Sequence, residues 1–222
     1  MKLVEAVTFQ MGSTTGDSDE APVHSVTISK DYYMGETEVT QALSEAVTGY
    51  SPTSDGYSWS SKDGLGDNYP AYYISYEDVQ SFITELNSLT GENFRMPIEA
   101  EWEFAARGGN KSKGYKYSGS NTIGDVAWYS KNTRSKTYAV KTKAANELGI
   151  YDMSGNVHEW CSDWYGEYSS RAQTDPTGPT TGTRRVHRGG CWYSNAASCR
   201  CAYRGSNAPS FRFYDLGVRL AL

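Results

Sequence analysis

The sequence predicts an α+β protein built as one domain. Helical periodicity is confined to residues 40–107, and short alternating segments precede and follow it. Gly, Pro, Ser and Asp separate the elements throughout. Because helices concentrate in the first half and irregular β structure in the second, the pattern is typical of an α+β fold. The chain shows no linker-like break and no internal repeat, so we expect a single domain over residues 1–222.

The composition excludes several classes of partner. The net charge is −5 and no long basic run occurs, so a nucleic-acid partner is not expected. No apolar run reaches the length that spans a membrane. The 18 Tyr and 6 Trp residues favour binding faces, because their rings combine apolar area with a polar tip.

Three strands are predicted in the first 40 residues, over 4–11, 23–28 and 32–39. Apolar and polar residues alternate roughly in each of them, as in strands with one buried face. Segments rich in turn residues separate the strands, which indicates short connections between them.

Three further segments have apolar residues three or four positions apart and predict helices over 40–47, 77–89 and 97–107. Thr40 is a suitable N-cap for the first helix, and Ser75 begins the second with a capping-box pattern. Glycines follow all three helices as stop signals. The predicted core-facing residues are Leu43, Ala46 and Val47 in the first helix, Val79, Phe82, Ile83, Leu86 and Leu89 in the second, and Ile98, Trp102 and Ala105 in the third.

The second half of the chain is irregular. Residues 114–161 read as turns and short strands, and residues 166–185 as a loop rich in Gly, Pro and Thr. The chain ends in an alternating strand pattern over 216–222. Between Arg188–Gly190 and this strand lies a long segment with neither period, and such a segment is usually functional or disordered. It is too aromatic for disorder, so we expect an ordered loop that faces a ligand.

Two glutamates offer a candidate acid–base pair. Glu99 and Glu103 lie four positions apart on the third predicted helix, where they share a face. Paired carboxylates can transfer protons. We expect instead that both are solvated and compensate the helix dipole.

The four cysteines, Cys161, Cys191, Cys199 and Cys201, fit no CxxC metal pattern. Neighbouring Arg200 and Arg204 are expected to lower the thiol pKa of Cys199 and Cys201. A disulfide would join Cys191 to Cys199, or Cys161 to one of them. The alternative is that all four are ordinary buried thiols.

A tract over residues 149–160 offers ligands for a metal. Asp152 and Glu159 supply carboxylates, and the turn between them can aim the carbonyl oxygens of Gly155 and Val157 inward. Calcium prefers such a mixed set of oxygen donors. The alternative is a turn that Asp and Asn side chains stabilise by hydrogen bonds.

Several tracts together resemble one family, the formylglycine-generating-enzyme or sulfatase-modifying-factor domain, which has a divergent C-type-lectin-like fold. In order along the chain they are Phe9–Ser13, Gly35–Gln41, Phe94–Gly108, Asp152–Trp160, Ser162–Trp164, Arg188–Gly190 and Leu216–Arg219. The resemblance covers essentially the whole chain. It implies an α+β fold of this type with two main helices, and it implies a structural calcium ion bound by Asp152, Gly155, Val157 and Glu159.

The resemblance does not extend to the family's catalytic residues. Its oxygenases bind copper through two cysteines with four residues between them and oxidise a substrate cysteine. Cys201 lies where the second cysteine should be, whereas the first position is Ala196. A single thiolate cannot form a two-thiolate copper site. We therefore expect no catalytic residues and no copper, and we keep a copper-dependent formylglycine-generating oxidase as the alternative function.

Another branch of this fold fits the final tract, residues 188–222, better. It comprises variable proteins of bacteria and phages, which retroelements diversify by mutating adenines in codons for the C-terminal lectin-fold loops. Lys, Glu, Gln, Met and Trp cannot be reached by this route. Residues 193–215 contain none of the five, although roughly four would be expected from the composition of the chain. The resemblance implies a non-enzymatic protein that displays a diversified binding surface within about residues 188–222.

The predicted ligand contacts are Tyr193, Ser194, Ala197, Ser198, Tyr203, Gly205, Ser206, Ala208, Ser210, Phe211, Phe213, Tyr214 and Asp215. Tyr, Ser, Gly and Asn are typical of adaptable binding loops. We expect a monomer that binds a protein or a cell-surface ligand. We also expect Met1 to replace a removed leader, because residues 1–5 lack the apolar segment of a signal peptide. The protein would then be secreted or held at the cell surface, as a lipoprotein is. An ordinary polar loop on a structural module, with calcium as its only ligand, remains open.

Overall fold

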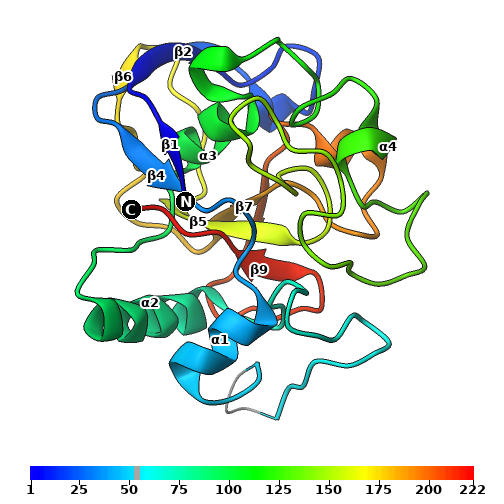
Figure 1. Cartoon of the computed structure of the whole chain (residues 1–222). Coiled ribbons are helices and arrows are strands. Elements are labelled where there is room, and N and C mark those ends of the chain that lie inside the picture. Colours follow the sequence, from blue (N-terminus) through cyan, green and yellow to red (C-terminus); the bar gives the residue numbers. More distant parts are fainter. Residues whose placement is uncertain (53–55) are drawn as a thin grey trace.

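The computed structural model describes residues 1–52 and 56–222 and confirms the α+β prediction (Figure 1). Its helices are α1 (Gln41–Thr48), α2 (Tyr76–Thr90), α3 (Glu99–Ala106) and α4 (Ile123–Val126). Its strands are β1 (Lys2–Val4), β2 (Val7–Met11), β3 (His24–Ile28), β4 (Tyr32–Met34), β5 (His158–Trp164), β6 (Gln173–Thr174), β7 (Arg185–Arg188), β8 (Gly205–Asn207) and β9 (Leu216–Val218). Short 3₁₀ turns occur at Ser18–Glu20, Gly109–Lys111 and Ala196–Cys199.

The predicted N-terminal strands are present, but they are divided between two sheets. The segment predicted over 4–11 forms β1 and β2, and the segment predicted over 32–39 ends as a strand at Met34. Strand β1 pairs antiparallel with β4, while β2 pairs antiparallel with β3. Strand β6 joins β3 in parallel, so the loop predicted over 166–185 contributes a strand.

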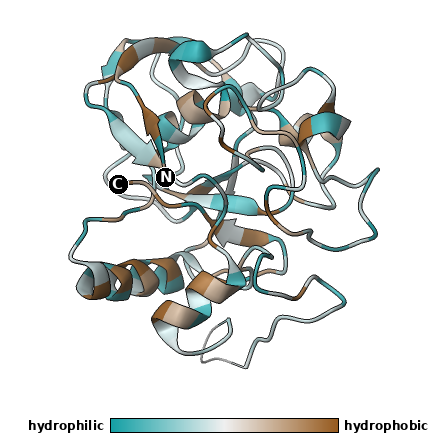
Figure 2. Ribbon diagram, in the orientation of Figure 1, coloured by the Kyte–Doolittle hydropathy of each residue, from teal (hydrophilic) through white to brown (hydrophobic). Residues whose placement is uncertain are grey.

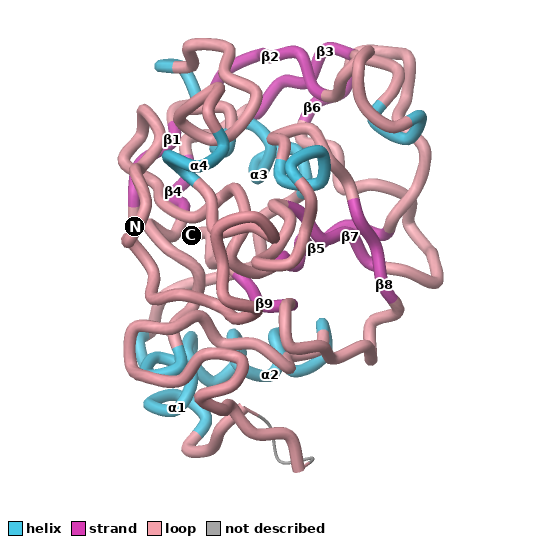
Figure 3. Tube along the Cα trace, turned by 90° about the vertical axis from the view of Figure 1, so that its right-hand side faces the viewer, coloured by secondary structure: helices cyan, strands magenta, loops and turns pink. Residues whose placement is uncertain are grey.

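A central sheet of strand order β8-β7-β5-β9 holds both ends of the final tract (Figure 3). Strand β5 pairs antiparallel with β7 on one side and parallel with β9 on the other. Strand β7 ends at Arg188 and strand β9 begins at Leu216, and the two strands flank β5. The final tract therefore starts on one side of β5 and returns to the sheet on the other side. The predicted terminal strand is shorter than expected. After Val218 the chain leaves β5, and Ala221 makes single bridges to Met34 and Arg95.

Local signals correctly predict where the first two helices begin and end. The Thr40 hydroxyl accepts a hydrogen bond from the Leu43 amide, and Ser75 and Asp78 form a reciprocal capping box. Gly49 and Gly91 end these helices in the left-handed conformation, with φ of 75° and 74°.

Other details of the helix predictions are wrong. Helix α3 begins at Glu99, two residues later than predicted, because Ile98 keeps an extended backbone as its N-cap. Leu43, Ala46 and Leu89 were assigned to the core, but all three are exposed, Leu43 and Leu89 by 39% and 64%. Neither α1 nor α2 buries its full apolar stripe, since each packs on one side only.

Two apolar clusters flank the central sheet. One joins α3 to the N-terminal strands and includes Trp102 and Met153. The other joins α1 and α2 to the opposite side of the sheet and includes Phe82 and Trp160. Figure 1 shows these helices on the two sides, and Figure 2 shows the apolar bands along α1 and α2. Within the described residues, no helix is long and apolar enough to cross a membrane.

Candidate ligand-binding surface

The five arginines of the final tract all form ion pairs with carboxylates elsewhere in the chain. The pairs are Arg188 with Glu99 and Glu103, Arg200 with Glu20, Arg204 with Glu99, Arg212 with Asp78, and Arg219 with Glu159. Four of the five guanidinium groups are largely or fully buried, at 0–11% side-chain exposure. The tract is therefore attached to the body of the domain at regular intervals, although it has little secondary structure of its own.

Glu99 and Glu103 are central to this network, so their predicted solvation is wrong. They are 4% and 0% exposed. Arg188 lies 2.8 Å from the Glu99 carboxylate, and Arg204 donates two hydrogen bonds of 2.7 Å to it. Burial alone would raise the pKa of Glu103, but the guanidinium groups of Arg188 and Arg107 outweigh it and hold that pKa below its ordinary value. These carboxylates are structural anchors for the tract.

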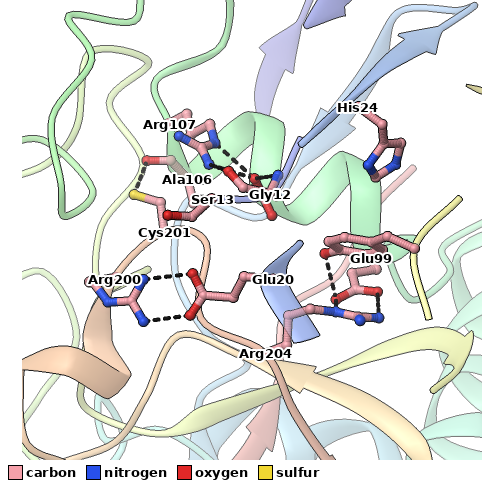
Figure 4. A network of polar contacts seen from close by, with 12 residues as sticks. Gly12, Ser13, Glu20, His24, Glu99, Ala106, Arg107, Arg200, Cys201 and Arg204 are labelled. Atoms are coloured by element: carbon pink, nitrogen blue, oxygen red, sulfur yellow. Dashed lines mark hydrogen bonds and ion pairs between the residues drawn. The ribbon is translucent and has the colours of Figure 1, made fainter. Parts of the chain in front are cut away.

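Arg200 and Arg204 bind carboxylates and do not activate thiols (Figure 4). Arg200 makes a bidentate pair with the fully buried Glu20, at 2.6 and 2.5 Å. Arg204 also lies 3.9 Å above the centre of the Tyr168 ring. With both guanidinium groups engaged, the expected lowering of the thiol pKa values is absent.

All four cysteines are free and buried, so neither predicted disulfide is present. Burial raises the pKa of Cys199 and of Cys201 to about 12. The Cys201 thiol donates to the Ala106 carbonyl at 3.4 Å (Figure 4). Ala196, at the position of the missing first cysteine, lies in the 3₁₀ turn and packs on an apolar cluster with Cys199. The alternative of ordinary buried thiols describes these residues better.

Four of the predicted contacts form one aromatic cluster at the surface: Tyr193, Phe211, Phe213 and Tyr214. The ring centroids of Phe213 and Tyr214 lie 4.1 Å apart, and Tyr193 lies 5.8 Å from Tyr214. Tyr193 and Phe211 are the most exposed members, at 44% and 38%, and exposed apolar side chains that are contiguous are typical of interaction sites. Trp192 is buried beneath, at 5.4 Å from the Tyr214 ring, and supports the cluster.

The other predicted contacts fall into three groups. Ala197, Ala208 and Ser210 are exposed, and Ser198, Tyr203, Gly205 and Ser206 are half-buried. Ser194 and Asp215 are buried, so they do not offer side chains to an exposed patch. Ser194 instead accepts a hydrogen bond from the Cys191 amide and shapes the turn after Gly190.

A small pocket beside the aromatic cluster was missed by the sequence analysis. It has a volume of about 240 Å³, and its lining includes His158, His187, Asn207 and Asp215. Two of the three histidines in the chain meet there, with ring centroids 4.4 Å apart. The scarcity of histidine is the one sequence signal that could have drawn attention to this place. The sheet order that joins β5 to β7 is what brings the two rings together.

The predicted calcium ligands lie together in a region rich in negative charge. The Asp152 carboxylate accepts a hydrogen bond from the Lys141 amide, at 2.8 Å. Glu159 is paired with Arg219 and also accepts a hydrogen bond from Trp102. A third buried carboxylate, Glu38, accepts hydrogen bonds from the Val157 amide and from Asn156.

Three buried carboxylates thus share one guanidinium group, that of Arg219. Burial, together with Asp152 and Glu159, raises the pKa of Glu38 well above its ordinary value, and burial raises that of Asp152 to about 6. Carboxylate and carbonyl oxygens are the donors that calcium prefers, and the excess negative charge here would favour a bound cation. Glu159 would contribute only by sharing its carboxylate with Arg219.

Comparisons with known proteins agree with this architecture. The family model described as the sulfatase-modifying factor enzyme 1-like domain matches residues 1–222. The chain is 31% identical to the chaperone protein LppX of Paenibacillus barcinonensis, over 98% of this chain and 87% of that protein. It is 29% identical to the formylglycine-generating enzyme of Streptomyces coelicolor, over 96% of this chain and 86% of that protein.

Among solved structures, Treponema denticola variable protein 1 superposes with a TM-score of 0.86 at 33% identity, covering 100% of this chain and 94% of that one. The comparisons therefore confirm both the predicted fold and the predicted likeness to a variable protein. They include enzymes as well as a variable protein, so likeness alone does not distinguish the two activities.

The buried ion pairs make a prediction about stability. Arg188→Leu should lower the free energy of unfolding by about 3–5 kcal/mol, because it leaves Glu99 and Glu103 with less compensating charge in the interior. Urea denaturation followed by tryptophan fluorescence measures the change. The matched control is Lys141→Met, which removes an exposed pair with Glu36 and should cost less than about 1 kcal/mol. Equal losses in the two variants would contradict the anchoring role.

Proposed function

The chain belongs to the sulfatase-modifying factor enzyme 1-like domain family, and from this premise we propose that it is a non-enzymatic binding protein. Its final tract displays ligand-contacting residues on a lectin-type scaffold. One observation carries the proposal: large aromatic side chains are held at the surface of a tract whose arginines are all anchored. Aromatic residues supply most binding energy at protein interfaces, and they lose little conformational freedom on binding.

The alternation of anchored and exposed residues along the final tract supports this function. Its anchored residues alternate with exposed ones: Tyr193 precedes Arg200, and Phe211 flanks Arg212. Substitution at the exposed positions leaves the ion pairs intact, so the surface can change while the fold persists. The likeness to a Treponema denticola variable protein supports diversification of this kind. Sequencing the locus in many isolates should find substitutions concentrated in residues 193–215, with the arginines unchanged.

The ligand that we propose is a protein or another molecule exposed on a cell surface. An aromatic surface beside a pocket of only about 240 Å³ suits such a partner better than a small metabolite, which would need a larger cavity. The protein would meet this ligand as a monomer at the cell surface or outside the cell.

A formylglycine-generating oxidase is the second candidate, because the chain is 29% identical to an enzyme of that name and retains Cys201. The burial of Cys201 and the presence of Ala196 in place of a second thiol both count against it. The family's copper site uses two thiolates, and Cys201 has no second thiol at position 196 with which to form it.

The oxidase alternative predicts Cu(I) binding that depends on Cys201. Titration with a chromophoric Cu(I) competitor should show no difference between the wild type and Cys201→Ser if the binding proposal is right. Tight uptake that Cys201→Ser abolishes would favour the oxidase instead.

The binding proposal predicts the effect of removing exposed rings. The double variant Tyr193→Ser/Phe211→Ser should lose capture of labelled cell-surface proteins at least tenfold, because these are the two most exposed rings of the aromatic cluster and lie at its two ends. Its melting temperature should stay close to that of the wild type, since neither side chain is buried. Capture is measured by affinity isolation and mass spectrometry, with Tyr33→Ser as control because Tyr33 is as exposed but lies on β4. Undiminished capture by the double variant would reject the proposed surface.

We also propose that calcium stabilises the scaffold by binding to the predicted ligands within residues 152–159, which we call the tract at Asp152. Adding EGTA should lower the melting temperature, because the ion no longer offsets the excess buried carboxylate charge, and excess calcium should restore it. In Asp152→Asn the response to EGTA should disappear, whereas the exposed-site control Asp67→Asn should retain it. A melting temperature that EGTA leaves unchanged in the wild type would refute the calcium site.

A further inference from the structure

Three metal-binding side chains of different chemistry meet beside the aromatic cluster, and two of them, His158 and Asp215, also line the adjacent pocket. They are His158 at the start of β5, Cys191 just after the Gly189-Gly190 turn, and Asp215 just before β9. Their ligand atoms all lie within 4.8 Å of one another. None of the three has a role in the ion-pair network that anchors the tract.

The central sheet explains why these residues come together. Strand β5 lies between β7 and β9, and His158 is the register partner of Leu216. The His158 amide donates a hydrogen bond of 2.7 Å to the Asp215 carbonyl. Cys191 follows the end of β7 by three residues, so the turn after that strand delivers its thiol to the same place. The cluster is therefore built on paired backbone and does not depend on mobile side chains meeting by chance.

We propose that His158, Cys191 and Asp215 form a binding site for a divalent transition-metal ion of the zinc class, with a fourth position open toward the pocket. An imidazole, a thiolate and a carboxylate are the donors that zinc combines in proteins. Calcium and magnesium prefer oxygen donors alone, so this site is chemically distinct from the tract at Asp152. Three protein ligands leave one tetrahedral position for water or for a donor from a bound molecule.

The geometry is close to that of a zinc site. With bonds of about 2.0–2.3 Å, tetrahedral donors lie about 3.3–3.7 Å apart. His158 Nε2 and Asp215 Oδ2 are already 3.8 Å apart. The widest separation in the cluster is up to 4.8 Å, so metal binding requires a contraction of about 1 Å, which side-chain rotation at Cys191 can supply.

A second imidazole supports the ring of His158. Nε2 of His158 faces the Asp215 carboxylate at 3.8 Å, so it is the nitrogen that would bind the ion. The His187 ring packs edge-on against His158 and would hold it in place.

The site would connect the interior to the displayed surface. Tyr193 and Asp215 line the same pocket, so one member of the aromatic cluster lies beside a proposed ligand. The ion would also cross-link both ends of the tract to β5. Metal binding itself does not depend on the proposed ligand-binding function and can be tested without a ligand.

The test uses the purified full chain, stripped of metal and kept in excess calcium so that the tract at Asp152 does not compete. Titration with Co²⁺ should give one equivalent of binding, with a thiolate-to-cobalt charge-transfer band and the visible bands of a tetrahedral ion. Zn²⁺ should then bleach both. Cys191→Ser should abolish the charge-transfer band and weaken Zn²⁺ binding at least tenfold.

Cys199→Ser is the matched control, because Cys199 is equally buried and lies outside the cluster. It should keep the spectrum and the affinity of the wild type. Asp215→Asn supplies a second variant, expected to retain the charge-transfer band with weaker Zn²⁺ binding. The proposal is overturned if wild-type protein shows no thiolate band, or if the band survives in Cys191→Ser. Loss of the band in Cys199→Ser with retention in Cys191→Ser would assign the metal to a different thiol.

Discussion

The burial of arginine–carboxylate pairs is the constraint on which the final tract depends. A segment of more than 30 residues with little regular structure keeps one conformation because Arg188, Arg200, Arg204 and Arg219 each reach a carboxylate in the interior. Removing one partner from such a pair is costly, whereas exposed positions between the pairs tolerate change. Rigidity and tolerance of substitution can therefore coexist in one tract, because different residues are responsible for each.

Features with local causes could be predicted from the sequence. The caps at Thr40 and Ser75 and the stops at Gly49 and Gly91 each depend on residues within one helical turn. The fold was predicted from several family motifs in the correct order, which local periodicity alone could not have supplied.

Features that depend on distant partners could not be predicted. Glu99 reads as a solvated helix residue because its partner Arg204 lies 105 positions away. For the same reason the thiols of Cys199 and Cys201 seemed activated, since nothing local shows that the neighbouring arginines are already paired. The histidine pocket requires the order of β7, β5 and β9, and hydrophobic patterning does not encode strand order.

The attachment of the tract on both sides of β5 has a consequence for how this scaffold can evolve in length. Its two ends are held at a fixed separation because β7 and β9 both pair with β5. The loop between them must therefore close over the same distance whatever its sequence or length. Closure entropy grows only logarithmically, and doubling a flexible loop costs about 0.6 kcal/mol. Insertions between the anchors at Arg204 and Arg212 would therefore cost little closure entropy, provided that they spare the Pro209 carbonyl, which accepts a hydrogen bond from the Tyr76 amide. The scaffold can acquire new loop lengths as well as new side chains.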